Sequence, residues 1–240
     1  MLIIGLTGSI ATGKSTVSNR LKEQGIPVVD ADLIAKHIVD KGKPAYNKIV
    51  KCFGPLSDNL LQQDGEINRQ ELGKLVFGPA NKSNLQKLNS ITHPKVGWEM
   101  ILEVIKCYIK GYDMVVLDVP LLFEANFHYY CGTVINVICD EDLQLSRLLV
   151  RNPQLSESEA QKRIGSQMSM SSKSSLSNIV IENNGSLEEL YASVDGIVKD
   201  IKPNKLWSTT EWFIFPFGLV VGAVRYFQNV WKYKQMKKID

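Results

Sequence analysis

Apolar positions along the chain follow two alternating patterns, and together they predict an α/β fold. Short continuous apolar runs predict buried strands at residues 2–6, 26–29, 114–119, 133–139 and 179–181. Segments with helical spacing predict helices at residues 16–23, after Asp32 to residue 39, and at 143–151, 157–168 and 187–201. This alternation is typical of a doubly wound parallel sheet, in which ligands bind beyond the carboxyl ends of the strands.

Two parts of the chain interrupt this alternation. Residues 45–110 have mostly helical spacing, with breaks predicted at Gly54-Pro55, Gly78-Pro79 and His93-Pro94. We interpret this stretch as a helical, substrate-binding insertion. A Ser-rich polar segment at 169–177 follows two predicted helices and favours a mobile lid over about residues 143–177. The predicted organisation is therefore one domain at 1–202 and a tail at 203–240.

A glycine-rich loop follows the first strand and precedes the first helix. Its sequence, GSIATGKS, matches the P-loop pattern GxxxxGK[ST] and predicts phosphate binding by backbone amides and the helix N-terminus. Lys14 is expected to reach the β- and γ-phosphates of ATP and to be catalytic, and Ser15 to bind Mg²⁺. The predicted nucleotide-binding residues are Gly8, Ser9, Ile10, Ala11, Thr12, Gly13, Lys14, Ser15 and Thr16. The alternative is a glycine turn that matches by chance.

Charge and cysteine content narrow the function further. The 240 residues carry a formal charge of +3, but six basic and two acidic residues lie from Pro203 onward, leaving about −1 for the rest. A nearly neutral body argues against a nucleic-acid partner. The four cysteines form no CxxC pair and are expected to be reduced thiols. Since the chain opens directly on the strand and P-loop, we expect the domain to face the cytosol.

The acceptor of the phosphoryl group must be inferred from the rest of the sequence. A GTPase is disfavoured because no NKxD motif is present: Asn81-Lys82 is followed by Ser-Asn. A small-molecule kinase fits better. Two alternative functions stay open. One is a kinase of another small acceptor, such as a nucleoside monophosphate, and the other is a nucleotide-binding scaffold or membrane-recruitment protein in which the tail is the functional segment.

The chain resembles the dephospho-CoA kinase family over about residues 1–200. The resemblance lies in GLTGSIATGKS at 5–15, VDAD at 29–32, ITHP at 91–94, DVPLLFE at 118–124, Arg147, the RIxxQ segment at 163–167, Lys173 and IxNxG at 181–185. It implies that ATP phosphorylates the ribose 3′-hydroxyl of dephospho-CoA, which is the last step of CoA synthesis. It also implies a P-loop NTP-hydrolase-type fold.

Roles for individual residues follow from the chemistry and the resemblance. Asp32 is the candidate catalytic base that also binds the acceptor hydroxyl, unless it caps the following helix; Asp30 is expected to be the more structural of the two. Arg147 is a candidate catalytic residue and Arg163 a substrate-binding one, since guanidinium groups from the lid can close over phosphates. The alternative is a solvated surface position.

Three further predictions concern the segments that flank the cleft. Asp118 is expected to hold the water shell of Mg²⁺, or else to play a turn role before Pro120. Leu121, Leu122 and Phe123 are predicted to form an apolar wall for the substrate. His93 is expected to mark a helix boundary or fill the core, with substrate contact as its functional alternative.

The tail has a composition of its own. Residues 212–224 are uncharged and mostly apolar, and Arg225 and four lysines follow. Because a membrane span needs about 20 apolar residues, this run favours an interfacial or hairpin-like anchor over residues 212–231. The alternative is packing on the protein itself or on a partner. We therefore expect attachment to an intracellular membrane, either the mitochondrial outer membrane or the endoplasmic reticulum. Assembly with other CoA-synthesis enzymes is a further hypothesis.

Overall fold

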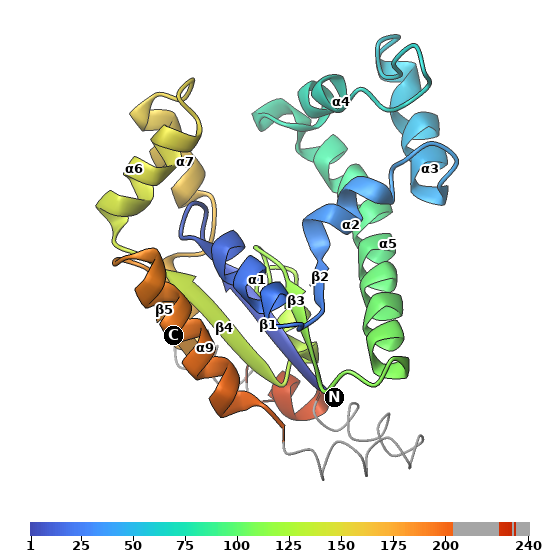
Figure 1. Cartoon of the computed structure of the whole chain (residues 1–240). Helices are drawn as coiled ribbons and strands as arrows, with labels where there is room; N and C mark the ends of the chain where they lie inside the picture. Colours follow the sequence, from blue (N-terminus) through green and yellow to red (C-terminus); the bar gives the residue numbers. More distant parts are fainter. Residues whose placement is uncertain (204–225, 232, 234–240) are drawn as a thin grey trace. The chain divides into compact units, whose positions relative to one another are not determined.

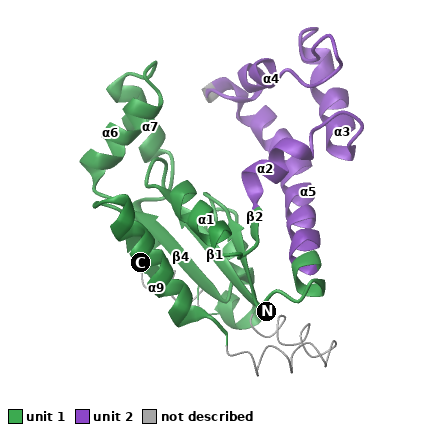
Figure 2. Cartoon of the chain, in the orientation of Figure 1, with its two compact units in different colours: residues 1–29, 106–240 green, residues 30–105 purple. Residues whose placement is uncertain are grey.

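The computed structural model describes residues 1–203, 226–231 and 233, and these form two compact units. Unit 1 contains residues 1–29 and the described residues from 106 onward, and unit 2 contains residues 30–105 (Figure 2). Most of the predicted anchor, residues 212–225, lies outside the described residues. Within the described part, no helix combines the length and the apolar character needed to cross a membrane.

A five-stranded sheet forms the centre of unit 1. Its strands are β1 (Leu2–Gly8), β2 (Val28–Asp30), β3 (Met114–Asp118), β4 (Thr133–Ile138) and β5 (Ile179–Glu182), in the order β2-β3-β1-β4-β5. The pairs β1–β3, β1–β4 and β4–β5 are parallel. In this register Leu6 is level with Asp118 and Gly8 with Val137, so β1 and its neighbours end at the same edge. The predicted doubly wound parallel fold is confirmed.

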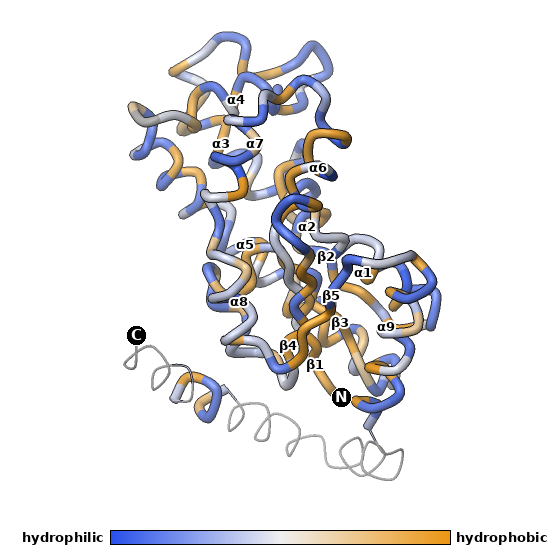
Figure 3. The backbone as a smooth tube through the Cα atoms, turned by 90° about the vertical axis from the view of Figure 1, so that its left-hand side faces the viewer, coloured by the Kyte–Doolittle hydropathy of each residue, from blue (hydrophilic) through white to orange (hydrophobic). Residues whose placement is uncertain are grey.

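Helices α1 (Lys14–Glu23) and α9 (Leu187–Ile201) cover one face of this sheet (Figure 1). Alternate strand residues such as Ile4, Leu6 and Ile135 pack there against Val17 of α1 and Val194 of α9. The strands are correspondingly hydrophobic along their length (Figure 3). Arg20 ties the two helices together, since its Nε and Nη2 donate to the Asp195 carboxylate at 2.9 and 2.6 Å.

The opposite face is covered by the segment after β3 and by α8 (Met170–Leu176). Gly5 lets this segment approach closely, since a Cβ there would lie 2.8 Å from both Leu122 and Cys131 side-chain atoms. Ser174 of α8 accepts a hydrogen bond from Asn136 Nδ2 at 3.2 Å. The Ser-rich segment at 169–177 contains a helix at 170–176, because Ser169 caps it and it packs on the sheet, while its mobility as part of a lid stays a prediction.

Two further helices of unit 1 follow β4. They are α6 (Glu141–Arg151) and α7 (Glu157–Gly165). A capping box formed by Ser156 and Glu159 starts α7, since the hydroxyl accepts from the Glu159 amide and the carboxylate accepts from the Ser156 amide. The helix ends at Gly165, three residues before the predicted end at Met168.

Unit 2 is helical. Its elements are α2 (Ala31–His37), α3 (Pro44–Phe53), η1 (Gly54–Leu56), α4 (Arg69–Val76), η2 (Pro79–Asn81) and most of α5 (Lys82–Ile109). Its core contains Ile49, Phe53, Leu60 and Val76, each no more than 1% exposed. The unit therefore has an apolar core of its own, separate from that of the sheet.

The predicted break at His93-Pro94 is wrong, because α5 continues through Pro94. A proline inside a helix removes one hydrogen bond and costs about 3 kcal/mol or more. Leu88 and Ile91 before it pack against the unit 2 core and Met100 after it is buried, so tertiary packing on both sides favours one continuous helix. His93 and Pro94 themselves are exposed.

Candidate active site

The P-loop backbone is shaped by Gly13 and held by Asn183. Gly13 has φ 94° and is the N-cap of α1, a left-handed conformation that glycine adopts without strain. A Cβ at Gly13 would lie 2.1 Å from Asn183 Nδ2, which donates to the Thr12 carbonyl at 2.9 Å. Asn183 follows β5 and is 8% exposed. The glycine is therefore required both by the turn and by this buried amide.

Two glutamine side chains hold Ile10 from either side. The Ile10 amide donates to Gln167 Oε1 at 3.0 Å, and Gln144 Nε2 donates to the Ile10 carbonyl at 2.7 Å. Gln144 lies on α6 and is 1% exposed, while Gln167 follows α7. The P-loop and the α6–α7 pair are thus joined directly. Gln167 ends the RIxxQ segment of the family resemblance but was given no role, and Gln144 was not singled out because an isolated glutamine carries no distinctive signal.

The two charged residues predicted at the phosphates contact each other. Lys14 Nζ donates to Asp118 Oδ1, and their side chains are 15% and 5% exposed. Lys14 begins α1 and Asp118 ends β3, so the contact joins the P-loop helix to the neighbouring strand. Both the Mg²⁺ role and the turn role of Asp118 stay predictions. Ser15, in the first turn of α1, is exposed.

Lys173 is a buried cation beside this site that was noted only as part of the family resemblance. Its side chain is fully buried, and Nζ lies 3.1 Å from the Pro120 carbonyl and 3.4 Å from Glu124 Oε1. Burial lowers the pKa of Lys173, and the nearby Glu124 carboxylate opposes that shift. Thr7 Oγ1 donates to the same Pro120 carbonyl at 3.0 Å. The segment after Asp118 is therefore fixed from two sides.

The predicted arginines differ in their surroundings. Arg147 on α6 is half-buried and its Nη1 donates to the Asn183 carbonyl at 3.0 Å, so it supports the residue that holds Thr12. Burial raises the pKa of the neighbouring Cys139 thiol, and Arg147 opposes that rise. Arg163 on α7 is exposed, which fits the alternative prediction of a solvated surface position. The structure brings Arg147, but not the Arg163 side chain, into contact with the P-loop supports.

The predicted apolar wall is mostly core. Leu122 is fully buried and Phe123 is 4% exposed, with its ring 5.1 Å from that of His128. Only Leu121 presents a surface, being 45% exposed. Direct substrate contact by Leu122 and Phe123 is therefore wrong for this structure. An apolar run after a strand does not reveal which of its members turn inward, and here the close approach at Gly5 draws Leu122 into the core.

Three candidate residues lie in unit 2. Asp30 caps α2, accepting a hydrogen bond from the Leu33 amide at 2.9 Å, which is the structural role expected of it. Asp32 stands in the first turn of the same helix, so its carboxylate is not the N-cap. His93 lies within α5 and is exposed, so neither the helix-boundary nor the core interpretation holds.

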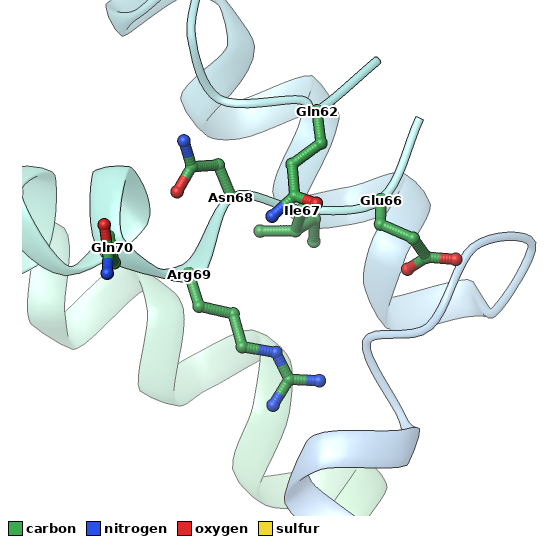
Figure 4. Close-up of a pocket in the computed structure, with 6 residues that line it drawn as sticks. All are labelled: Gln62, Glu66, Ile67, Asn68, Arg69 and Gln70. Atoms are coloured by element: carbon green, nitrogen blue, oxygen red, sulfur yellow. The ribbon is translucent and has the colours of Figure 1, made fainter. Parts of the chain in front are cut away.

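Unit 2 also contains a surface pocket of about 640 Å³, shown in Figure 4. The residues around it are Gln62, Glu66, Ile67, Asn68, Arg69 and Gln70. Arg69 Nη2 donates to the Lys36 carbonyl at 2.9 Å and lies 3.9 Å from Asp40 Oδ1. Its guanidinium group therefore ties α4 to the end of α2 within this unit.

The oxygen groups at the P-loop fit a hard divalent cation. The Ser15 hydroxyl and the Asp118 carboxylate are both oxygen donors of the kind that Mg²⁺ prefers. Among the described residues, no group of three or more His, Cys, Asp or Glu side chains is placed to hold a metal. This donor set suits a cation that is held largely by water and phosphate oxygens, as Mg²⁺ is in kinases.

Comparison of the sequence with those of known proteins identifies relatives over most of the chain. The sequence model of the dephospho-CoA kinase family matches residues 2–189. A dephospho-CoA kinase of Saccharomyces cerevisiae is 49% identical over 224 residues, which cover 93% of this chain and 92% of that protein. An uncharacterised Schizosaccharomyces pombe protein is 42% identical over 239 residues, covering 99% of both chains.

A solved structure supports the same assignment. The dephospho-CoA kinase of Campylobacter jejuni has a TM-score of 0.65 and 30% identity, with 83% of this chain and 96% of that chain covered. The match over residues 2–189 includes both the P-loop and the Asp118–Glu124 segment. This chain therefore belongs to the dephospho-CoA kinase family.

Proposed function

We propose that this chain transfers the γ-phosphoryl group of ATP to the ribose 3′-hydroxyl of dephospho-CoA, forming CoA and ADP. The observation that carries the proposal is the P-loop, braced at Ile10 and Thr12, whose Lys14 is paired with Asp118. In the transfer, a bond forms between the 3′-oxygen and the γ-phosphorus, and the bond from that phosphorus to the β,γ-bridging oxygen breaks. The kinase family to which the chain belongs supports this choice of acceptor.

Binding of the triphosphate is assigned to the P-loop and the start of α1. The backbone amides around Gly13 and the positive end of α1 favour the β-phosphate, and Lys14 supplies a full positive charge. Lys14 can release Asp118 when phosphate oxygens become its partners. Charge that spreads over the transferring group is stabilised by preorganised donors of this kind.

Ser15 and Asp118 are the residues assigned to Mg²⁺. When bound with ATP, Mg²⁺ offsets the charge of the β- and γ-phosphates. Ser15 would contribute its hydroxyl and Asp118 would accept hydrogen bonds from the water shell of the ion. Because Asp118 also pairs with Lys14, it would orient both positive groups that bind the phosphates, the Lys14 ammonium and Mg²⁺.

Asp32 is assigned as the base for the acceptor hydroxyl. Its carboxylate would accept the hydrogen bond of the 3′-hydroxyl and then its proton, an effect worth about 10² to 10⁴ in rate. Two observations support this choice over Asp30. Asp30 is occupied as the cap of α2, whereas Asp32 lies in the following turn and is not needed for that cap.

The proposed reaction is tested by incubating the purified chain with ATP, Mg²⁺ and dephospho-CoA and measuring CoA by mass spectrometry. We expect CoA formation that is lost in Lys14→Ala. A panel containing nucleoside monophosphates separates the reaction from a kinase of another acceptor. ATP binding without turnover on any acceptor would contradict the enzyme assignment and favour a nucleotide-binding scaffold.

We further propose that the tail attaches the enzyme to an intracellular membrane with the kinase domain facing the cytosol. Phe227 and Trp231, four residues apart, expose 69% and 67% of their surface, and aromatic side chains favour the membrane interface. Lys232 and Lys234 follow in the sequence and suit anionic headgroups. The membrane is either the mitochondrial outer membrane or the endoplasmic reticulum.

Vesicle sedimentation tests this membrane proposal. Parent protein is expected to sediment with phosphatidylcholine vesicles that contain phosphatidylserine, and Phe227→Ser with Trp231→Ser to reduce the bound fraction several-fold. Gln228→Ser, an exposed polar neighbour, is the matched control. Parent protein that stays in the supernatant with these vesicles would contradict the proposal. Gel filtration with the enzyme that makes dephospho-CoA tests the proposed CoA-synthesis assembly.

A further inference from the structure

The described part of the tail is anchored on unit 1 by polar contacts. Residues 226–231 are helical and, together with Tyr233, are called here the tail helix (red in Figure 1). Asn229 Nδ2 donates to the carbonyls of both Tyr129 and Cys131, at 3.1 and 2.9 Å. The Tyr233 hydroxyl donates to the Leu176 carbonyl at 3.2 Å. Leu176 is the last residue of α8, and Tyr129 and Cys131 lie at the end of η3 (Phe127–Tyr130), so the tail donates to backbone carbonyls near the ends of two elements.

An aromatic cluster buries the same side of the tail helix. Tyr233 is 4% exposed, and its ring centroid lies 4.4 Å from that of His128, 5.9 Å from Tyr129 and 6.5 Å from Phe123. Tyr226 adds a contact with Tyr130 at 5.2 Å. Tyr233 is therefore a core residue of unit 1, although it lies in a part of the chain that composition separates from the kinase domain.

These contacts reach the two segments that meet beside the P-loop. Phe123 precedes Glu124, and Leu176 lies on α8 with Lys173. Lys173 and Glu124 pair with each other, and Lys173 also donates to Pro120, two residues after Asp118. Tyr233 therefore contacts α8 at Leu176 and the loop at Phe123, and Lys173 connects the same helix to the same loop through Pro120 and Glu124.

We propose that the tail helix is a positioning element of the kinase, in which Asn229 and Tyr233 hold residues 119–131 and α8 in the arrangement that serves the acceptor site. The activity part of this inference rests on the proposed function. Leu121, the exposed member of the loop, and the Lys173–Glu124 pair are the groups whose placement depends on the tail. The braces on Ile10 and Thr12 come from Gln144, Gln167 and Asn183, none of which is part of the tail.

Because the tail contacts residues 119–131 and α8 but not the braces of the P-loop, we expect its loss to affect the kinetics of dephospho-CoA and not those of ATP. Asn229→Ala and Tyr233→Ala, made in the full chain, should lower kcat/KM for dephospho-CoA about tenfold, since small displacements at a site can cost up to about 100-fold. The KM for ATP should stay within about twofold of the parent. Tyr233→Phe keeps the ring and removes the hydroxyl that donates to Leu176, so it should fall between parent and Tyr233→Ala. Gln228→Ala, an exposed amide next to Asn229, is the matched control and should behave as the parent.

Hydrogen exchange provides a readout that is independent of activity. Exchange of amides in residues 121–131 should accelerate in Asn229→Ala and Tyr233→Phe but not in Gln228→Ala. Variants measured well below their unfolding temperature that keep parental kinetics for both substrates would overturn the positioning role. Unchanged exchange would overturn it as well, even if the parent forms no CoA. Absence of CoA from the parent, in turn, would count against the proposed reaction rather than against the tail contact.

Discussion

Lys14 and Asp118 pair across 104 residues of sequence, at the point where the P-loop helix begins and the neighbouring strand ends. The pair is nearly buried, with side-chain exposures of 15% and 5%. Because each charge is the other's partner, removing one leaves its mate without compensation. The same two side chains are assigned to phosphate and to Mg²⁺, so the pair links the stability of the site to its chemistry.

Lys14→Met is expected to abolish CoA formation, and Asp118→Asn to lower it strongly. In urea unfolding, a double-mutant cycle of these two changes should give a coupling of about 1–3 kcal/mol, because hydrogen bonds to charged groups contribute that much. Additive effects on the free energy of unfolding would show that the contact contributes nothing to stability. Retention of CoA formation by Lys14→Met would remove Lys14 from the reaction.

Gln167→Ala should weaken ATP binding with little effect on the acceptor. The change removes the bond from Gln167 to the Ile10 amide, and a bond worth about 1 kcal/mol corresponds to a KM for ATP raised about fivefold. Gln161→Ala on α7 is the control, because Gln161 is exposed and its side-chain amide donates to Glu157 of the same helix. Equal KM values for ATP in the two variants would mean that Gln167 does not organise the P-loop.

Asp32→Asn and Asp30→Asn form a matched pair on α2. The first should lower kcat by about 10² to 10⁴ while sparing the KM for ATP, since only the base is lost. The second should leave kcat and stability near the parent values, since asparagine caps a helix about as well as aspartate. Steady-state kinetics at saturating ATP decide the matter. A kcat for Asp32→Asn equal to that of the parent would contradict the assignment of Asp32 as the base.

The regular elements and the phosphate loop could be predicted because their signals are local. The apolar run of β1, the P-loop pattern and the spacing of α1 are contiguous, and α9 runs over Leu187–Ile201 as predicted because a capping box at Ser186 marks its start. Asp30 was expected to be structural on similar local grounds, since it directly precedes a helix. Each of these features is decided by residues within a few positions of one another.

The supports of the site could not be predicted, because each depends on residues far apart in sequence. Gln144 and Gln167 reach Ile10 from 134 and 157 residues away. Lys173 lies in a Ser-rich stretch whose composition indicates a loop, yet packing makes it a helix with a buried cation. Tyr233 lies 57 residues beyond its partner Leu176, in a stretch whose aromatic and basic composition equally suits a membrane interface.

Stability is expected to fall above about pH 9 because of the buried thiol of Cys131. Burial raises the pKa of Cys131 from 9.0 to about 12, so an unfolded chain loses this proton in a range where the folded chain keeps it. The folded state then binds more protons, and each such group lowers the free energy of unfolding by up to about 1.4 kcal/mol per pH unit. Burial raises the pKa of Tyr233 to about 12 from 10.0, which acts in the same direction above pH 10.

Lys173 changes the free energy of unfolding in the opposite direction as pH rises. Its pKa is lowered on folding, so the unfolded chain binds the additional proton and stability increases with pH. Urea unfolding at half-unit steps from pH 8 to pH 10 covers the range in which the Cys131 thiol acts, and Tyr233 contributes mainly above it. Comparison of variants then separates the Cys131 contribution from those of Lys173 and Cys139, whose pKa values are also shifted by burial. Cys131→Ala should flatten the loss of stability with pH, whereas Cys52→Ala, at an exposed thiol, should keep the parental slope. If Cys131→Ala and the parent lose stability equally between pH 9 and 10, another group controls the alkaline transition.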